Sequence, residues 1–214
     1  MRYSPLLLTL AAAILPATAF AQAGAGSSDP SADEDKGRKG VEIVGHVLKP
    51  IPLEWSEERM ARLALPPGFD INVYAQDLKN ARMMRVADDG RLYITRRKQG
   101  DVLMLQDTTG DGAADTRQVV AQKDQMHGIE VVGDTAYLMT VKDLYRAPRL
   151  EDGTLGELEV IATDFPDGGQ HPNRMVVMGP DGRLYVSIGS TCNACAETDD
   201  ESAAIVSLNP DGTD

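Results

Sequence analysis

Among the three histidines of the chain, His171 stands where an imidazole can do acid–base chemistry. It lies just before a predicted strand–turn–strand unit at residues 174–189, so its side chain can reach whatever lies over that end of the sheet. Imidazole is the side chain whose ordinary pKa makes it a usable base near neutral pH. We therefore predict that His171 is a general base. The alternative is a polar residue that caps a loop.

Cys192 and Cys195 form the motif Cys-Asn-Ala-Cys and are the only cysteines of the sequence. In an exported protein, an even count of cysteines predicts a disulfide, and a reactive thiol pair is the alternative. A zinc site would need two further ligands at suitable spacing, which the sequence lacks. Covalent haem attachment would need a histidine directly after the second cysteine, where Ala196 stands.

The segment 107–115, Asp-Thr-Thr-Gly-Asp-Gly-Ala-Ala-Asp, resembles the first half of a calcium-binding loop. Asp107, Asp111 and Asp115 present carboxylate oxygens, which hard cations prefer as ligands. Gln118 stands where such a loop needs its chelating glutamate. The alternative to a calcium site is therefore an ordinary turn between two strands.

A repeat of short strands must position these residues. Each copy is an apolar strand, a tight Asp-Gly or Gly-Asp turn, and a second strand that carries a tyrosine. The tyrosines are Tyr93, Tyr137 and Tyr185, which are 44 and 48 residues apart. A third strand follows in each copy, and a fourth follows in the first two. Four short strands per unit of about 40–50 residues predict a β-propeller blade, and a β-sandwich with chance spacing is the alternative.

We therefore predict an all-β fold, a β-propeller of four-stranded blades, with about three blades in residues 65–214. Propellers usually close with about four to eight blades, so we expect this chain to be one part of a larger propeller. Residues 41–64 are predicted to be an N-terminal extension with a short helix. Ser56 caps that helix over 57–63, and acidic residues occupy its first turn.

The N-terminus has the pattern of an export signal. Arg2 precedes a short apolar run at 6–19, and two small-x-small cleavage patterns follow. The run is too short for a membrane span, which needs about 20 apolar residues. We predict that 1–23 is removed as a signal peptide and that 24–40 is a disordered linker, because it has almost no core-forming residues. The mature protein is then periplasmic or secreted, without a membrane span.

The formal net charge of the chain is -12. Nucleic acids and anionic lipid surfaces attract basic patches, so this charge argues against both as partners. It does not identify a partner by itself.

Residues 65–214 resemble the soluble pyrroloquinoline-quinone (PQQ) dependent sugar dehydrogenases, in the branch of the L-sorbosone dehydrogenase-like proteins. The most specific part of the resemblance is a histidine before the third hairpin, followed by Gly-Ser-x-Cys-Asn-x-Cys. The matching motifs are Leu65-Pro-Pro-Gly-Phe-Asp-Ile71, Met126-His-Gly-Ile129, Gly168-Gly-Gln-His171, Gly179-Pro-Asp-Gly-Arg-Leu-Tyr-Val186 and Gly189-Ser-Thr-Cys-Asn-Ala-Cys195.

The resemblance implies a six-bladed propeller, of which this chain is the N-terminal part, with PQQ over the axial channel. His171 would take the proton of a sugar hydroxyl or hydrated aldehyde while a hydride leaves for the quinone, and calcium would hold and polarise the cofactor. His127 and Met126 would approach the cofactor from the preceding blade. Arg174 would reach an anionic group of cofactor or substrate, and a salt-bridged surface arginine is the alternative.

The implied activity is oxidation of a sugar or sugar-derived aldehyde, with electrons passing to an acceptor, either a cytochrome or a quinone. Gln170 and Ser190 stand where the glucose-oxidising branch has acidic residues, which argues against a simple glucose dehydrogenase. Two other functions stay open. One is a non-catalytic propeller that binds carbohydrate or protein. The other is a lactonase-type metal hydrolase, which would need carboxylates that converge on the channel.

Overall fold

The computed structural model describes residues 50–214. The predicted signal peptide (1–23), the predicted linker (24–40) and the first residues of the extension lie outside the described residues. The chain divides between Leu63 and Ala64 into two units, and each unit is described by itself. No helix of the described part is long and apolar enough to cross a membrane.

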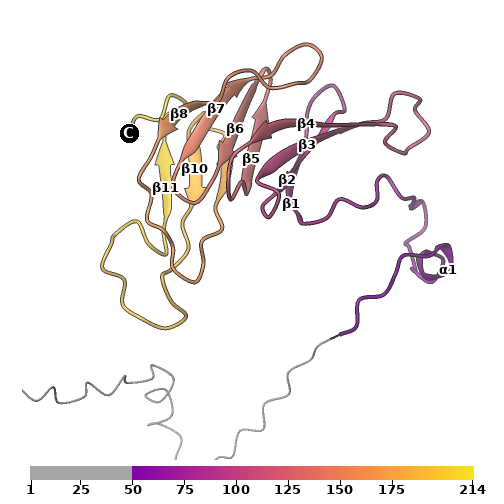
Figure 1. Ribbon diagram of the computed structural model, residues 1–214, viewed down its shortest axis with the longest axis horizontal. Coiled ribbons are helices and arrows are strands. Elements are labelled where there is room, and N and C mark those ends of the chain that lie inside the picture. The colour runs from indigo at the N-terminus through magenta and orange to yellow at the C-terminus, as the bar shows by residue number, and fades with distance from the viewer. Residues whose placement is uncertain (1–49) are drawn as a thin grey trace, which may run out of the picture. The chain divides into compact units, whose positions relative to one another are not determined.

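In the first unit, the described residues form one short helix, α1 (Glu57–Met60) (Figure 1). Ser56 is its N-cap, and the Ser56 hydroxyl accepts a hydrogen bond from the Arg59 amide at 3.3 Å. The helix ends earlier than the predicted 57–63. None of its residues is buried, and a helix this short gains too little from hydrogen bonding alone to extend without packing.

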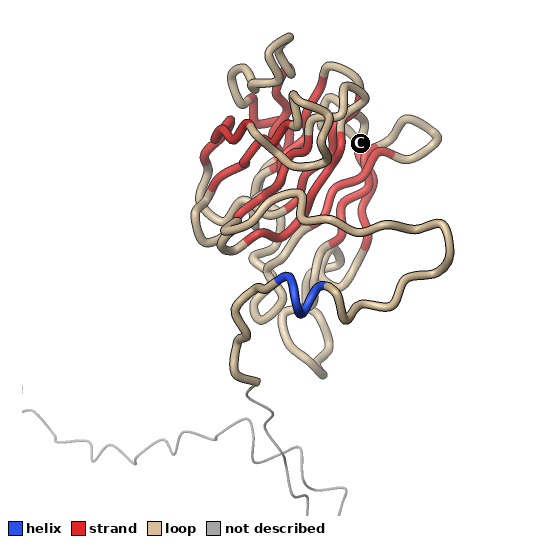
Figure 2. Tube along the Cα trace, turned by 90° about the vertical axis from the view of Figure 1, so that its right-hand side faces the viewer, coloured by secondary structure: helices blue, strands red, loops and turns tan. Residues whose placement is uncertain are grey.

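The second unit consists of three antiparallel sheets (Figures 1 and 2). In each sheet the strands are neighbours in chain order, as in a propeller blade. Blade 1 contains β1 (Ala81–Val86), β2 (Leu92–Arg96), β3 (Asp101–Gln106) and β4 (Thr116–Gln122); blade 2 contains β5 (Gly128–Val132), β6 (Thr135–Met139), β7 (Leu144–Pro148) and β8 (Glu159–Ala162); blade 3 contains β9 (Met175–Met178), β10 (Leu184–Ser187) and β11 (Ile205–Leu208). The prediction of an all-β fold built from propeller blades is confirmed.

The repeat seen in the sequence is also a repeat of turn geometry. In the β1–β2 turn, Gly90 N–H donates to the Ala87 carbonyl at 2.9 Å, and Ala87 N–H donates to the Arg91 carbonyl at 2.9 Å. The β9–β10 turn has the same two bonds at 3.0 and 2.8 Å. In both turns the aspartate before the glycine accepts from the arginine amide after it. Local turn chemistry therefore fixes where each inner hairpin reverses.

Apolar side chains fill the space between successive blades. Between blades 1 and 2, the core contains Tyr93 together with Val102, Met104, Met126, Ile129 and Leu138. Between blades 2 and 3, it contains Tyr137 together with Met139, Leu144, Val176, Leu184 and Val186. The repeated tyrosines thus pack between neighbouring sheets. Tyr185, on the last described sheet, is half-buried instead, and its hydroxyl donates to Asp181 at 2.7 Å.

Two polar connections run across all three blades and align them. Near the starts of the inner strands, Thr95, His127 and Arg174 are joined by hydrogen bonds. Further along the strands, buried Glu130 accepts from Arg85 of β1 and from the amide of Met178 in β9. The three sheets therefore run in the same sense. The segments 97–100, 123–127, 140–143, 163–174 and 188–204 lie at one end of the unit, here called the site end.

Candidate functional site

His127 is a buried residue at the site end, directly before β5. It is 5% exposed, its amide donates to the Met139 carbonyl at 2.9 Å, and its carbonyl accepts from the Thr95 hydroxyl at 2.6 Å. Its Nδ1 lies 2.7 Å from the Arg174 carbonyl oxygen. A carbonyl only accepts, so Nδ1 carries the proton and Nε2 keeps its lone pair.

The imidazole of His127 is neutral at neutral pH. Burial lowers its pKa, because desolvation disfavours the charged ring. The Arg174 carbonyl opposes that shift, and the positive charges of Arg82 and Arg97 add to it. His127 can therefore accept a hydrogen bond at Nε2 but does not supply positive charge.

His171 lies in the loop before β9 and is exposed. Its Nδ1 lies 3.0 Å from the Ser190 carbonyl oxygen and 3.2 Å from the Ser190 hydroxyl oxygen. The carbonyl fixes the proton on Nδ1, so Nε2 presents a lone pair. Gly189 packs directly against this residue. A Cβ at Gly189 would lie 2.2 Å from the His171 carbonyl oxygen, so only glycine fits there.

Arg174 is fully buried, which corrects the interpretation of this residue as a salt-bridged surface arginine. Its guanidinium donates to the carbonyls of His171 at 3.1 Å, Asn173 at 3.4 Å and Pro166. No carboxylate pairs with it among residues 50–214. It is therefore not a salt-bridged surface residue, and its Nε has no partner within residues 50–214. Contact with an anionic group of cofactor or substrate stays a prediction. Burial lowers its pKa, and the charge of Asp167 opposes that shift.

Met126 is fully buried in the core between blades 1 and 2, among Tyr93, Val102 and Ile129. This position gives Met126 a packing role, and its contact with a cofactor stays a prediction. Its flexible thioether fills a gap between two sheets, as methionine often does in cores.

The predicted disulfide joins Cys192 and Cys195, whose Cα atoms are 6.0 Å apart. It lies in the long loop between β10 and β11 (Figure 1). The loop reaches His171 through Ser190, whose hydroxyl donates to the Cys192 carbonyl at 2.5 Å. Within the same loop, the Glu197 carboxylate accepts from the Thr191 amide at 2.9 Å and from the Thr191 hydroxyl at 2.8 Å.

The loop 107–115 joins the far ends of β3 and β4, opposite to the site end. Asp107 accepts from the amides of Gly110 and Gly112, and Asp115 accepts from the Thr108 amide. These backbone hydrogen bonds lower the pKa of both carboxyls.

The carboxylate of Asp111 accepts from the Ala113 amide in the same loop, at 2.9 Å. Residues 50–214 contain no group of three His, Cys, Asp or Glu side chains that could hold a metal ion. Asp107, Asp111 and Asp115 are thus not brought together as a calcium site. The structure supports the alternative, a turn whose aspartates accept hydrogen bonds from its own backbone.

Two arginines at the site end were not recognised in the sequence. Arg97 follows β2, and its Nη2 donates to the Gln125 side chain at 3.0 Å while its buried Nε has no partner within residues 50–214. Arg82 lies in β1 and is exposed. Neither pairs with a carboxylate of the described part, although the chain carries a net charge of -12. The region around His127 is therefore locally positive.

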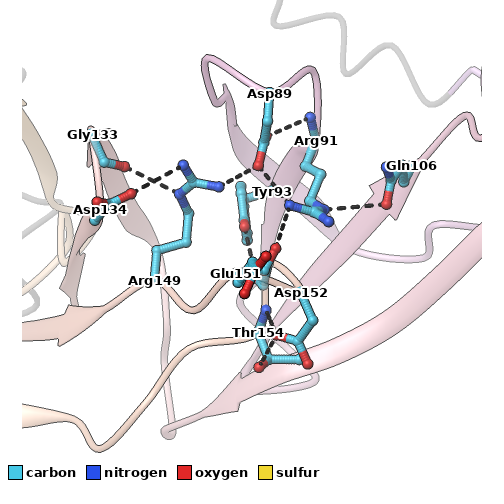
Figure 3. Close-up of polar contacts among 11 residues, drawn as sticks. Asp89, Arg91, Tyr93, Gln106, Gly133, Asp134, Arg149, Glu151, Asp152 and Thr154 are labelled. Atoms are coloured by element: carbon cyan, nitrogen blue, oxygen red, sulfur yellow. Dashed lines mark hydrogen bonds and ion pairs between the residues drawn. The ribbon is translucent and has the colours of Figure 1, made fainter.

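A second polar cluster holds blades 1 and 2 together at the opposite end (Figure 3). Asp89 of the β1–β2 turn pairs with Arg91 at 2.6 Å and with Arg149, which follows β7. Beside them, the Tyr93 hydroxyl donates to the Gly153 carbonyl at 2.7 Å. These contacts connect two sheets and lie away from both histidines, so we assign the cluster a structural role.

Comparison with known proteins agrees with this architecture. A family model described as TrAA12-like matches residues 63–208, more than half of the chain. No curated protein sequence matches this chain.

Three solved structures share the fold. The holo form of the pyranose dehydrogenase PQQ domain from Coprinopsis cinerea aligns with a TM-score of 0.58 and 18% identity, covering 64% of this chain and 35% of that one. A calcium structure of a Trichoderma reesei carbohydrate-active enzyme of family AA12 aligns with a TM-score of 0.53 and 21% identity, covering 60% and 34%. The PQQ-bound aldose sugar dehydrogenase from Streptomyces coelicolor aligns with a TM-score of 0.52 and 19% identity, covering 66% and 48%.

The chain spans about a third to a half of the length of these structures. At such identities the alignments show a shared propeller fold. Together with the family model, they show that the chain belongs to the TrAA12-like family.

Proposed function

We propose that this chain forms part of a quinone-dependent oxidoreductase that oxidises a sugar, with His171 as its general base. The observation that carries the proposal is the position of His171, an exposed residue at the site end whose Nδ1 lies 3.0 Å from the Ser190 carbonyl oxygen, which leaves Nε2 as the ring nitrogen that can accept a proton. The family match and the sugar dehydrogenases among the similar folds support the same reaction class.

His171 acts by taking the proton of the substrate hydroxyl at Nε2. As the O–H bond breaks and the carbon–oxygen double bond forms, a hydride leaves the same carbon. When bound, PQQ supplies the quinone that accepts this hydride. The Ser190 carbonyl stabilises the protonated ring, because its bond to Nδ1–H strengthens as the imidazole gains charge. A base positioned in this way contributes on the order of 10²–10⁴-fold in rate.

The described residues fit an anionic quinone better than they fit calcium. PQQ carries carboxylates, and Arg82 and Arg97 lack carboxylate partners within residues 50–214, with a buried Nε on Arg97 left unpartnered. Neutral His127 can accept a hydrogen bond beside them. Calcium has no comparable site, since the described part holds no group of three suitable ligands. Calcium therefore has no role in the steps above.

We also propose the finer assignments that the resemblance favours. Gln170 and Ser190 stand where the glucose-oxidising branch has acidic residues, which supports sorbosone or an aldose other than glucose as the substrate. A periplasmic or secreted location follows from the predicted signal peptide. The electron acceptor would then be a cytochrome or a quinone.

The test is dye reduction by the full-length protein loaded with PQQ and calcium, over a panel of aldoses and sorbosone. We expect sugar-dependent turnover that His171→Ala abolishes, while Arg146→Ala, at an exposed ion pair on blade 2, leaves it unchanged. Absence of turnover with every sugar, or equal turnover in His171→Ala, would overturn the proposal. Sugar binding without uptake of quinone would instead favour a non-catalytic propeller.

A further inference from the structure

We propose that Arg174 is a positioning residue that holds both histidines of the site, His171 through its guanidinium and His127 through its carbonyl. The structural part of this inference concerns this chain alone. Its catalytic consequence rests on the proposed function.

The first half of the coupling lies in the loop before β9. Three carbonyls, of Pro166, His171 and Asn173, accept from one guanidinium. The loop is also held by the loop 188–204, because the Gln170 amide donates to the Thr191 carbonyl at 3.1 Å and His171 Nδ1 lies 3.0 Å from the Ser190 carbonyl oxygen, but the His171 carbonyl itself is held by the guanidinium. The arginine therefore gathers the loop around itself and fixes where the backbone of His171 lies.

The second half crosses to blade 2. The Arg174 carbonyl accepts from His127 Nδ1 at 2.7 Å, and the His127 carbonyl accepts from the Thr95 hydroxyl of blade 1 at 2.6 Å. Thr95, His127 and Arg174 are all buried. This chain of hydrogen bonds therefore links the loop of His171 to two preceding sheets, away from competing water.

The site suits a guanidinium better than an ammonium. A guanidinium offers five donors in a flat fork, whereas a lysine ammonium is a single point charge that cannot span three carbonyls on one side. Gly168 leaves the room that this fork needs. A Cβ at Gly168 would lie 2.6 Å from Nη2 and 2.8 Å from Nη1 of Arg174, and its φ of +75° also favours glycine.

Within residues 50–214 the buried charge forms no ion pair: carbonyls accept from its Nη1 and Nη2, its Nε has no partner, and Asp167 acts on it only through its charge. Burying a charge without an ionic partner costs free energy, so neither a surface role nor packing alone explains an arginine at this position. Holding a catalytic loop in one geometry explains it. Misplacing a reacting group by about 1 Å can cost about 100-fold in rate.

The experiment compares Arg174→Met, Arg174→Lys and Gly168→Ala with the matched control Arg146→Met in the full-length protein. Nitrogen-15 NMR of the imidazoles reports which ring nitrogen carries the proton, and thermal unfolding checks that each variant folds. Steady-state kinetics with PQQ and sugar measures kcat and KM separately.

We expect wild-type His127 and His171 each to show a single Nδ1–H tautomer. In Arg174→Met and Gly168→Ala, His171 should change to a mixture of tautomers, and kcat should fall by about 10- to 100-fold with KM changed less than threefold. Arg174→Lys should retain the fold and give a smaller change of the same kind. Arg146→Met should change nothing.

An unchanged His171 signal in a folded Arg174 variant would overturn the inference, whatever the activity. If Arg174→Met does not fold, the same criterion applies to Arg174→Lys and Gly168→Ala. If the signals change as expected but the wild-type protein oxidises no sugar, the positioning role stands and the proposed function fails.

Discussion

Removal of the Glu130 side chain should destabilise the fold more than removal of any exposed ion pair. Glu130 is 7% exposed and lies where blades 1, 2 and 3 meet. Its carboxylate accepts from Arg85 Nε at 2.8 Å, Arg85 Nη2 at 3.1 Å, the Val131 amide at 3.0 Å and the Met178 amide at 3.3 Å. Glu130→Ala leaves all four donors without this acceptor.

The magnitude follows from that geometry. Breaking a buried ion pair by removing one partner costs about 3–5 kcal/mol. Here the Arg85 side chain is 34% exposed and can regain water, so we expect the low end, about 3 kcal/mol. For a unit of this size, about 3 kcal/mol lowers Tm by about 6–12 °C.

The assay is urea and thermal unfolding of the full-length protein, with Glu159→Ala as matched control. Glu159 pairs with Arg146, but the two side chains are 61% and 36% exposed, so solvent screens that pair and its loss should cost much less than the loss of Glu130. Equal decreases in the free energy of unfolding for Glu130→Ala and Glu159→Ala would show that the buried Glu130 carboxylate does not stabilise the contact between the three blades.

Three further predictions concern the opposite end and the disulfide loop. Burial opposes ionisation of Asp89, but hydrogen bonds from Arg91 and Arg149 hold its pKa below the ordinary value. The stability that Asp89 contributes should therefore be full above pH about 4 and be lost as the pH falls through the lowered pKa. In that range, the free energy of unfolding in urea should depend less on pH for Asp89→Asn than for the wild type. Replacing Cys192 and Cys195 with serine should lower the free energy of unfolding in urea by about 2 kcal/mol, a modest loss because the closed loop is short. The same replacement should lower kcat, because Ser190 contacts both His171 and the disulfide loop, and an unchanged kcat would contradict this link. Gly189→Ala should lower kcat by up to about 100-fold without a comparable change in KM, since the new Cβ would lie 2.2 Å from the His171 carbonyl oxygen. A normal kcat in a folded Gly189→Ala variant would show that the loop adapts.

The blades could be predicted from the sequence because their signals are local. Residue pairs such as Asp89-Gly90 and Asp181-Gly182 set the turns within a few residues, and alternating apolar residues set the strands around them. The place of His171 before a hairpin could be read in the same way.

The features that could not be predicted depend on contacts between blades or on the direction in which loop side chains point. Arg174 and Met126 look like residues near a sheet end, and nothing within a few positions shows that a neighbouring blade buries them. Arg97 was not recognised because the sequence cannot show that its guanidinium has no carboxylate partner within residues 50–214. The aspartates of 107–115 have the composition of a metal site, but the spacing could not show that their oxygens face backbone amides of the loop.

In the proposed oxidation, His171 Nε2 takes the substrate proton while the quinone accepts the hydride. Single-turnover reduction of bound PQQ by sugar, followed by absorbance, isolates this step when wild-type and His171→Ala full-length protein have equal cofactor content. We expect reduction to slow by about 10²–10⁴-fold in His171→Ala, with PQQ still bound. Reduction at the wild-type rate in that variant would show that His171 is not the base.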